Sequence, residues 1–377
     1  MFSRTYTHRP IFIVLAIAIL FAFALGGATV AGAAGDSGAV YTMTNAAGGN
    51  AVAVFSRAAD GTLTPAGTVP TGGLGTGGGL GNQGGLILSQ DHRWLFAVNA
   101  GSNEISVFQV RRDGLRLVDI ASSGGELPIS LTVHDELLYV LNAGGDGNIT
   151  GFRFNAHGEL SPVSNSTRPL SSAAPGPAQV AFRPDGRVLV VTEKDTNLID
   201  TYTVGGDGRA NGPMPQASSG QTPFGMAFDP RGRLFVSEAF GGAPDQSALS
   251  SYTVSNAGSL AVISASVGTT ETAACWVVIT GDGRYAYTTN TGSSSISGYR
   301  ISRDGTLTLL DDDGRTAETG DGSSPIDAAV SSDSEFLYAL TAGTNTIVAF
   351  QVGADGSLTP LPGISGLPAG ANGLAAR

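Results

Sequence analysis

The sequence is poor in the residues that cross-link chains and bind zinc. Among 377 residues there is one cysteine, Cys275, so no internal disulfide can form and no lipid-attachment cysteine follows the apolar N-terminus. Beyond residue 10 the histidines are His92, His134 and His157, and no cluster of histidine and cysteine has zinc-ligand spacing. We therefore expect a fold that rests on packing and sheet hydrogen bonds, with no cofactor and no metal.

Positive charge is also scarce. The chain has 20 Lys and Arg against 31 Asp and Glu, a net charge of -11, which argues against nucleic acid and anionic membrane as partners. Lys194 is the one lysine. No Gly-x-Ser-x-Gly motif occurs, which removes the commonest signature of a serine hydrolase.

The N-terminus has the pattern of an export signal. Arg4 and Arg9 precede an apolar run over residues 11–25, and small residues follow as far as Ala33. This pattern predicts a signal peptide over residues 1–33 and a secreted or extracytoplasmic protein. A retained N-terminal anchor is the alternative. After cleavage we expect no membrane partner.

What the chain has in abundance is glycine, 55 residues in all, and the glycines punctuate a repeat. Short apolar runs of period two alternate with Asp-Gly and Asn-x-Gly turns, which is the pattern of antiparallel hairpins. A central turn recurs seven times, about 49 residues apart, as expected of four-stranded propeller blades. The turns begin at Thr44, Val98, Leu141, Thr192, Ser237, Thr289 and Leu340.

The first repeat lacks its opening strand, and a matching strand stands at the C-terminus, over residues 373–376. Pairing of this strand with the first repeat would close a ring and leave no long open edge. The sequence therefore predicts an all-β fold: a seven-bladed β-propeller over residues 38–377, with four antiparallel strands per blade. We expect a monomer.

Strand order assigns the turns to two faces. The Asp-Gly turns, which also hold the three histidines, share one face, here named the Asp-Gly face. The central turns and the connections between blades share the other, here named the mouth face. A glycine-rich loop, residues 72–85, belongs to the mouth face. Its composition favours a flexible spacer over a loop that folds across the mouth and binds an anion.

Candidate catalytic residues stand where two central turns depart from asparagine. Glu193 and Glu238 occupy this position in adjacent repeats, so both carboxylates are expected at one mouth, where an acid and a base could act together. The competing interpretation is that each Glu caps a turn as Asn does. An oxygen-rich ring for a hard cation is a minority interpretation. The candidate substrate-binding residues are Lys194, Gln179, Asn99, Asn142, Asn290, Phe240, Trp276 and Asp327.

Residues 182–193 and 282–290 resemble the blade motifs of the lactonase family of seven-bladed propellers, which includes bacterial 6-phosphogluconolactonase and a fungal carboxymuconate lactonising enzyme. The resemblance implies a His, Arg residues and a Glu around the mouth. The family's Glu corresponds to Glu193. Its Gly-Pro-Arg-His motif reads Gly-Pro-Ala-Gln here, over residues 176–179, so the Arg and the His are both replaced.

These observations leave three hypotheses for function. The first is a secreted lactonase-like enzyme, with Glu193 and Glu238 as acid and base and a small-molecule ligand at the mouth. The second is a non-catalytic ligand- or protein-binding propeller that has lost the catalytic His and Arg and has kept the cavity. The third is an envelope or matrix interaction protein that uses the rims of the blades.

Overall fold

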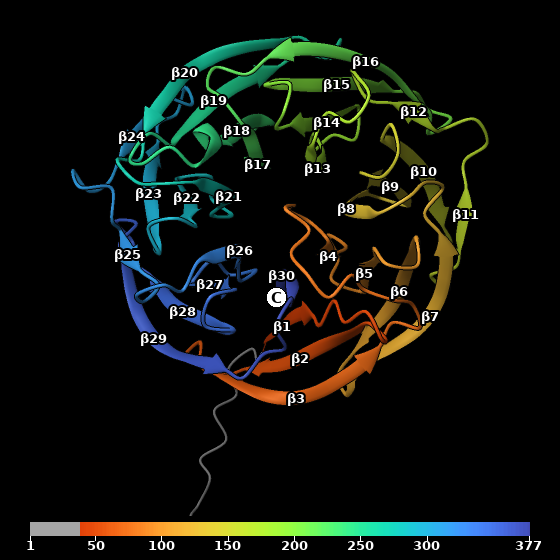
Figure 1. Cartoon of the computed structure of the whole chain (residues 1–377), viewed down its shortest axis with the longest axis horizontal. Helices are drawn as coiled ribbons and strands as arrows, with labels where there is room; N and C mark the ends of the chain where they lie inside the picture. The colour runs from red at the N-terminus through yellow and green to blue at the C-terminus, as the bar shows by residue number, and fades with distance from the viewer. Residues whose placement is uncertain (1–37) are drawn as a thin grey trace, which may run out of the picture. The chain divides into compact units, whose positions relative to one another are not determined.

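The computed structural model describes residues 38–377. The expected signal peptide, residues 1–33, lies outside this range. The described residues form seven antiparallel sheets arranged in a ring (Figure 1). The prediction of a seven-bladed propeller is confirmed.

Each blade runs outward from an innermost strand next to the central channel. The first three blades are β30 (Asn372–Ala376), β1 (Gly38–Met43), β2 (Ala51–Arg57) and β3 (Leu63–Pro70); β4 (Leu86–Leu88), β5 (Trp94–Asn99), β6 (Glu104–Arg111) and β7 (Gly114–Ser122); and β8 (Pro128–His134), β9 (Leu137–Asn142), β10 (Asn148–Phe154), β11 (Leu160–Pro162) and β12 (Arg168–Pro169). The next two are β13 (Pro177–Phe182), β14 (Val188–Glu193), β15 (Leu198–Val204) and β16 (Ala210–Ala217); and β17 (Pro223–Phe228), β18 (Arg233–Glu238), β19 (Ala248–Val254) and β20 (Leu260–Gly268). The last two are β21 (Ala274–Ile279), β22 (Tyr285–Asn290), β23 (Ser295–Ile301), β24 (Leu307–Leu309) and β25 (Ala317–Glu318); and β26 (Pro325–Val330), β27 (Phe336–Thr341), β28 (Thr346–Val352) and β29 (Leu358–Ser365).

The C-terminal strand closes the ring, as predicted. β30 pairs antiparallel with β1, with Tyr41 opposite Ala375. Beyond the strand, the Arg377 amide donates to the Ala39 carbonyl (2.9 Å) and the Arg57 guanidinium donates to the Arg377 carbonyl (3.1 Å). The first blade is thus built from both ends of the described chain, so that β1 is paired on both sides, with β2 and with β30.

Tyrosines on second strands join neighbouring blades. The Tyr139 hydroxyl donates to the carbonyl of Gly208 in the next blade (2.8 Å), and Tyr287 does the same to Gly356 (2.9 Å). Both acceptors are turn glycines with positive φ, 83° and 92°, a conformation that glycine adopts without steric cost. The regular Asp-Gly turns therefore connect the strands of a hairpin and also accept hydrogen bonds from the neighbouring blade.

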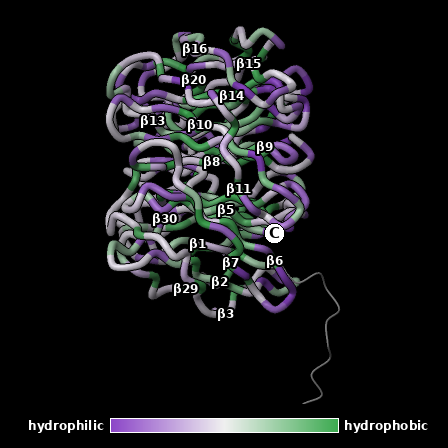
Figure 2. Tube along the Cα trace, turned by 90° about the vertical axis from the view of Figure 1, so that its right-hand side faces the viewer, coloured by the Kyte–Doolittle hydropathy of each residue, from purple (hydrophilic) through white to green (hydrophobic). Residues whose placement is uncertain are grey.

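The hydrophobic stretches of the chain coincide with the strands, and polar stretches lie on the turns at both faces (Figure 2). Second strands are buried along their whole length, as in β5, β9, β14, β18 and β22. The one helical element within residues 38–377 is the short η1 (Phe240–Gly242). No helix in this range is long and apolar enough to cross a membrane.

Candidate functional site

The glycine-rich loop closes the mouth of the channel. Between β3 and β4 the chain runs into the centre of the ring (Figure 1, orange). Its first half lies on the central turn of the first blade, where Asn45 accepts from the Thr76 amide (3.0 Å) and donates to the Gly78 carbonyl (2.7 Å). The loop is held in place by hydrogen bonds, so the spacer interpretation of residues 72–85 is wrong.

The second half of the loop inserts two side chains into the mouth, and we name Asn82 and Gln83 the plug. The Gln83 side-chain amide pairs with the backbone of Val277: Nε2 donates to its carbonyl (2.7 Å) and Oε1 accepts from its amide (3.1 Å). The Trp276 indole donates to the Asn82 carbonyl (2.7 Å). Asn82 Nδ2 donates to the Ile129 carbonyl. These bonds occupy main-chain groups on the inner strands of the third and sixth blades.

Two further features fit the plug to its surroundings. A Cβ on Gly225 would stand 2.2 Å from Gln83 Oε1, so only glycine leaves room for the carboxamide there. Lys194 donates from Nζ to the Gly81 carbonyl (2.7 Å) and the Pro177 carbonyl (3.1 Å) and lies 4.9 Å from the Phe224 ring centroid. Burial lowers the pKa of Lys194. The single lysine thus binds the loop to the fourth blade.

Glu193, one predicted catalytic residue, is fully buried at the end of β14. Its carboxylate accepts from the Ser171 amide (3.0 Å), the Ser171 hydroxyl and the Thr196 hydroxyl (2.7 Å). Its acidic neighbour is Asp200 on β15 rather than Glu238. Asp200 is also fully buried, and burial together with the Glu193 charge raises its pKa to about 8.

Glu238 is fully buried as well. It accepts from the Gly220 amide (2.7 Å) and from the hydroxyls of Ser250 (2.6 Å) and Ser266 (2.6 Å). Glu193 and Glu238 share no hydrogen-bond partner in the described chain. Each accepts from a backbone amide in the connection that precedes its blade and from nearby hydroxyls, which is the arrangement that turn capping requires. Their catalytic role stays a prediction.

The predicted substrate-binding asparagines are buried and hydrogen-bonded, as the two glutamates are. Asn99, Asn142 and Asn290 are fully buried, and each donates to a side chain within its own blade, as Asn99 does to Ser106 (2.7 Å). Phe240 is half-buried in η1. Of the predicted site residues, Trp276 and Lys194 contact the glycine-rich loop, and Gln179 and Asp327 line the channel.

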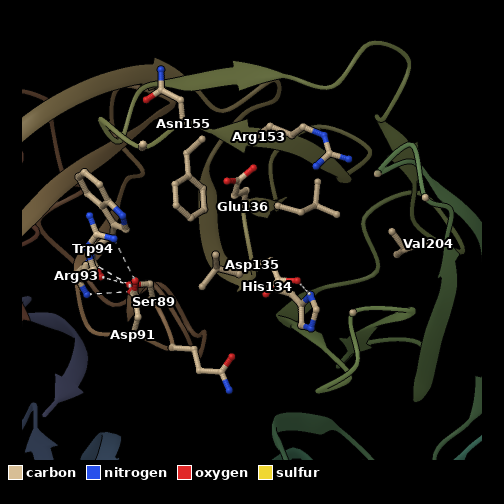
Figure 3. A pocket seen from close by; sticks show the side chains of 18 of the residues that line it. Ser89, Asp91, Arg93, Trp94, His134, Asp135, Glu136, Arg153, Asn155 and Val204 are labelled. Atoms are coloured by element: carbon tan, nitrogen blue, oxygen red, sulfur yellow. Dashed lines mark hydrogen bonds and ion pairs between the residues drawn. The ribbon is translucent and has the colours of Figure 1, made fainter.

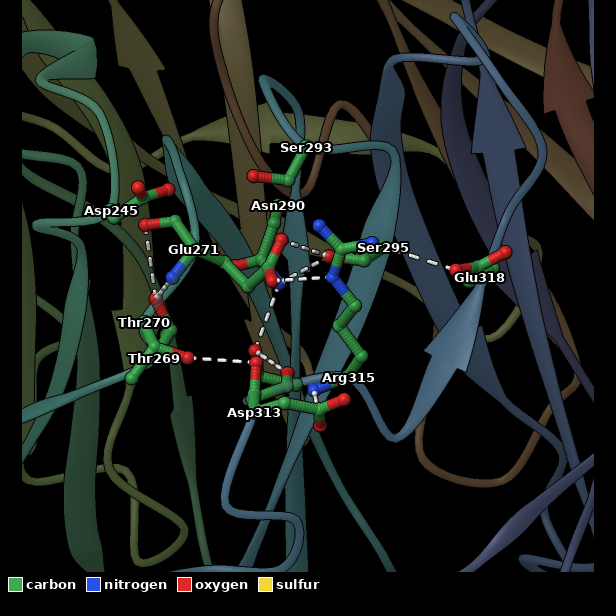
Figure 4. Close-up of polar contacts among 12 residues, drawn as sticks. Asp245, Thr269, Thr270, Glu271, Asn290, Ser293, Ser295, Asp313, Arg315 and Glu318 are labelled. Atoms are coloured by element: carbon green, nitrogen blue, oxygen red, sulfur yellow. Dashed lines mark hydrogen bonds and ion pairs between the residues drawn. The ribbon is translucent and has the colours of Figure 1, made fainter.

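Sequence reasoning missed a buried acid in the sixth blade. Glu271 accepts from Arg315 (2.7 Å) and from the Ser295 hydroxyl (3.0 Å), and Arg315 also lies 3.5 Å from the exposed Glu318 (Figure 4). Ser295 in turn accepts from Asn290. No local pattern distinguishes Glu271 in the sequence. The plug could have been recognised in the sequence, because Asn82 and Gln83 are consecutive residues with carboxamide side chains within a run of glycines.

The channel beneath the plug is a cavity of about 290 Å³. Its lining comprises Gln83, Gly84, Leu86, Ile87, Leu88, Leu131, Thr132, Val133, Gln179, Val180, Ala181, Asp327, Ala328 and Leu374. The first four residues of β17 and β21 are buried, whereas the last two are partly exposed. The cavity is therefore closed at the mouth by Gln83 and opens toward the Asp-Gly face.

A larger hollow of about 940 Å³ lies on the Asp-Gly face between the second, third and fourth blades (Figure 3). His134 lies in it, which confirms the predicted face of this residue; its Nε2 is 3.0 Å from the Pro184 carbonyl. Several charged groups at its rim are paired within the protein, as Asp91 is with Arg93 (4.0 Å). Trp94 is buried, so its ring is not available for stacking on a ligand.

Comparison with known proteins identifies one family and several solved structures of similar fold. A model of the family described as lactonase, 7-bladed β-propeller, matches residues 39–172 and 278–365. A protein from Lactobacillus plantarum has a TM-score of 0.72 at 16% identity, over 90% of this chain and 99% of that one. The periplasmic gluconolactonase of Pseudomonas aeruginosa has a TM-score of 0.68 at 17% identity, over 89% and 98%. At such identities the likeness shows the fold alone.

Among curated sequences, an uncharacterised protein of Staphylococcus aureus strain USA300 is 33% identical over 88 residues. The matched stretch is 22% of this chain and 26% of the relative, so the chain spans about a quarter of the relative's length.

Proposed function

The chain belongs to the lactonase family of seven-bladed β-propellers. Within this family we propose that it is a binding propeller without lactonase activity. The observation that carries the proposal is the plug. Asn82 and Gln83 occupy the mouth and use the polar groups of Trp276 and Val277 that a ligand there would need. A substrate could reach the mouth only after these hydrogen bonds had been broken.

The state of the two candidate acids supports the same proposal. A general acid or base must come within hydrogen-bond distance of the group whose proton it transfers. Glu193 and Glu238 have no exposed surface, and each already accepts at least three hydrogen bonds. A side chain in that condition stabilises its own blade and the connection that precedes it, and it offers no group to a substrate.

Lactone hydrolysis is the alternative, since the Pseudomonas aeruginosa neighbour is named a gluconolactonase. In this chain hydrolysis would require the glycine-rich loop to leave and Glu193 to exchange its partners. Lys194 opposes that change, because its bond to Gly81 holds the loop against the fourth blade. Export of the protein, which the N-terminal sequence suggests, is part of the proposal, so its ligand would be met outside the cytoplasm.

The test is a turnover assay on the protein comprising residues 34–377. Glucono-δ-lactone and 6-phosphogluconolactone are added in turn, and acid release is followed in a pH-stat beside protein-free buffer. We expect the rate to equal the spontaneous rate. The matched variant is Glu193→Gln, and hydrolysis that exceeds the spontaneous rate and is lost in this variant would overturn the proposal.

A further inference from the structure

The channel cavity has the composition of a binding site. Most of its lining residues are aliphatic, polar groups contribute strongly to its surface, and its volume of about 290 Å³ lies at the lower limit of small-molecule sites, roughly 300 Å³. Apolar side chains together with a few placed polar groups are the usual arrangement for orienting a small ligand. The cavity is also separate from the mouth, because Gln83 lies between the two.

Two side chains, each more than nine-tenths buried, present polar atoms to this space. Gln179 uses Oε1 to accept from the Met226 amide (2.6 Å), and no described residue accepts from its Nε2. Asp327 uses Oδ1 to accept from the Ala328 amide (2.8 Å), and the Leu374 amide also lies close to this carboxyl. Gln179 and Asp327 are 8% and 3% exposed. Because both side chains line the cavity, a ligand inside it can form hydrogen bonds with them.

The charge of the lining defines the class of ligand. None of the described residues that line the cavity is basic, so a carboxylate or a phosphate would lose its hydration without a compensating cation. Burial raises the pKa of Asp327 well above its ordinary value, which favours the neutral acid, a hydrogen-bond donor. Gln179 Nε2 is a donor as well. The polar groups therefore suit an uncharged acceptor oxygen.

We propose that the channel, entered from the Asp-Gly face, binds a small uncharged and mostly aliphatic carbonyl compound, with its oxygen at Asp327 or Gln179. This deepens the proposed binding function and rests on it. The two are tested separately, because a ketone binds without being hydrolysed. Lactone turnover would overturn the proposed function, whereas the ketone experiment below tests the channel site alone.

The experiment compares three probes with the same ring: cyclohexanone, cyclohexylammonium and cyclohexanecarboxylate. Each is titrated into the protein comprising residues 34–377 and its dissociation constant is measured by ligand-observed NMR. We expect saturable binding of cyclohexanone and at least tenfold weaker binding of both ions. Equal or tighter binding of either ion would overturn the assigned class, and no saturable binding of the ketone would overturn the site.

Three variants locate the binding. Ala181→Leu fills the cavity and should abolish binding of cyclohexanone. Ala227→Leu is its matched control, since Ala227 has the corresponding position in β17 and does not line the cavity. Asp327→Leu removes the donor without adding a charge and should weaken binding roughly five- to tenfold.

Asp327→Asn keeps a donor at the same place and should bind cyclohexanone within about twofold of the parent protein. Thermal unfolding of every variant is recorded to show that it is folded. If Ala181→Leu and Asp327→Leu are folded and both bind cyclohexanone as the parent does, the channel is not the site.

Discussion

The buried pair of Asp200 and Glu193 predicts an unusual pH dependence of stability. Both carboxyls are fully buried. No described residue donates a hydrogen bond to Asp200, whereas Glu193 accepts three. Neutral Asp200 can donate to the Glu193 carboxylate, but ionised Asp200 would face it as a second negative charge. The fold therefore requires the proton on Asp200.

The sign and size of the effect follow from the pKa. Burial, followed by the hydrogen bond with Glu193 and then by the Glu193 charge, raises the pKa of Asp200 from 3.8 to about 8. The folded state holds a proton that the unfolded chain releases above pH 3.8, so this contribution to stability is full in acid and is lost as the pH rises toward 8. One pH unit between the two pKa values is worth about 1.4 kcal/mol. At pH 7 the titration of Asp200 therefore lowers the free energy of unfolding by about 4 kcal/mol, compared with a side chain that cannot ionise.

The variant that isolates this cost is Asp200→Asn, which keeps the shape and a donor for Glu193 and cannot ionise. Its free energy of unfolding should nearly equal that of the parent at pH 4 and exceed it by about 4 kcal/mol at pH 7. The measurement is urea-induced unfolding at several pH values, followed by the fluorescence of Trp94 and Trp276. Asp229→Asn is the contrasting control, because Asp229 is ion-paired with Arg233 and its loss should destabilise. A difference between Asp200→Asn and the parent that does not grow with pH would refute the reasoning.

Four further predictions concern the plug, the seam, the closure of the ring and export. Gln83→Leu leaves the Val277 backbone groups unpaired and should lower the free energy of unfolding by about 2 kcal/mol, whereas the exposed Gln90→Leu should change it little; equal effects in urea unfolding would contradict the plug. Glu193→Gln should cost about 2 kcal/mol by the same measurement, because charge-assisted hydrogen bonds are lost, and an unchanged midpoint would argue against a capping role. Removal of residues 366–377 deletes β30 and should abolish cooperative thermal unfolding; a truncated protein that melts like the parent would disprove closure through β30. Protein recovered outside the cytoplasm should begin near Ala34 on N-terminal sequencing, and an intact Met1 would instead support an anchor.

The sequence by itself determined the fold, because the relevant information is local. Alternation within a strand and the glycine of a turn are set by adjacent residues, so Asp282-Gly283 between β21 and β22 could be recognised without knowledge of the rest of the chain. Repetition then supplied the number of blades, and the unpaired first repeat showed that residues 373–376 had to close the ring. The face that carries His134 followed from strand order alone.

Only the tertiary structure decided what happens at the centre of the ring. Gln83 bonds to Val277, 194 residues away, and Asn82 bonds to Ile129, 47 residues away. No spacing within the loop encodes such partners, so composition alone suggested a spacer. The orientation of Glu193 was equally hidden, because its position in the repeat fixes the turn and leaves open whether the side chain faces the channel or the seam. Strand and turn patterns are properties of neighbouring residues, whereas the plug, the buried acids and the cavity exist only where distant segments meet.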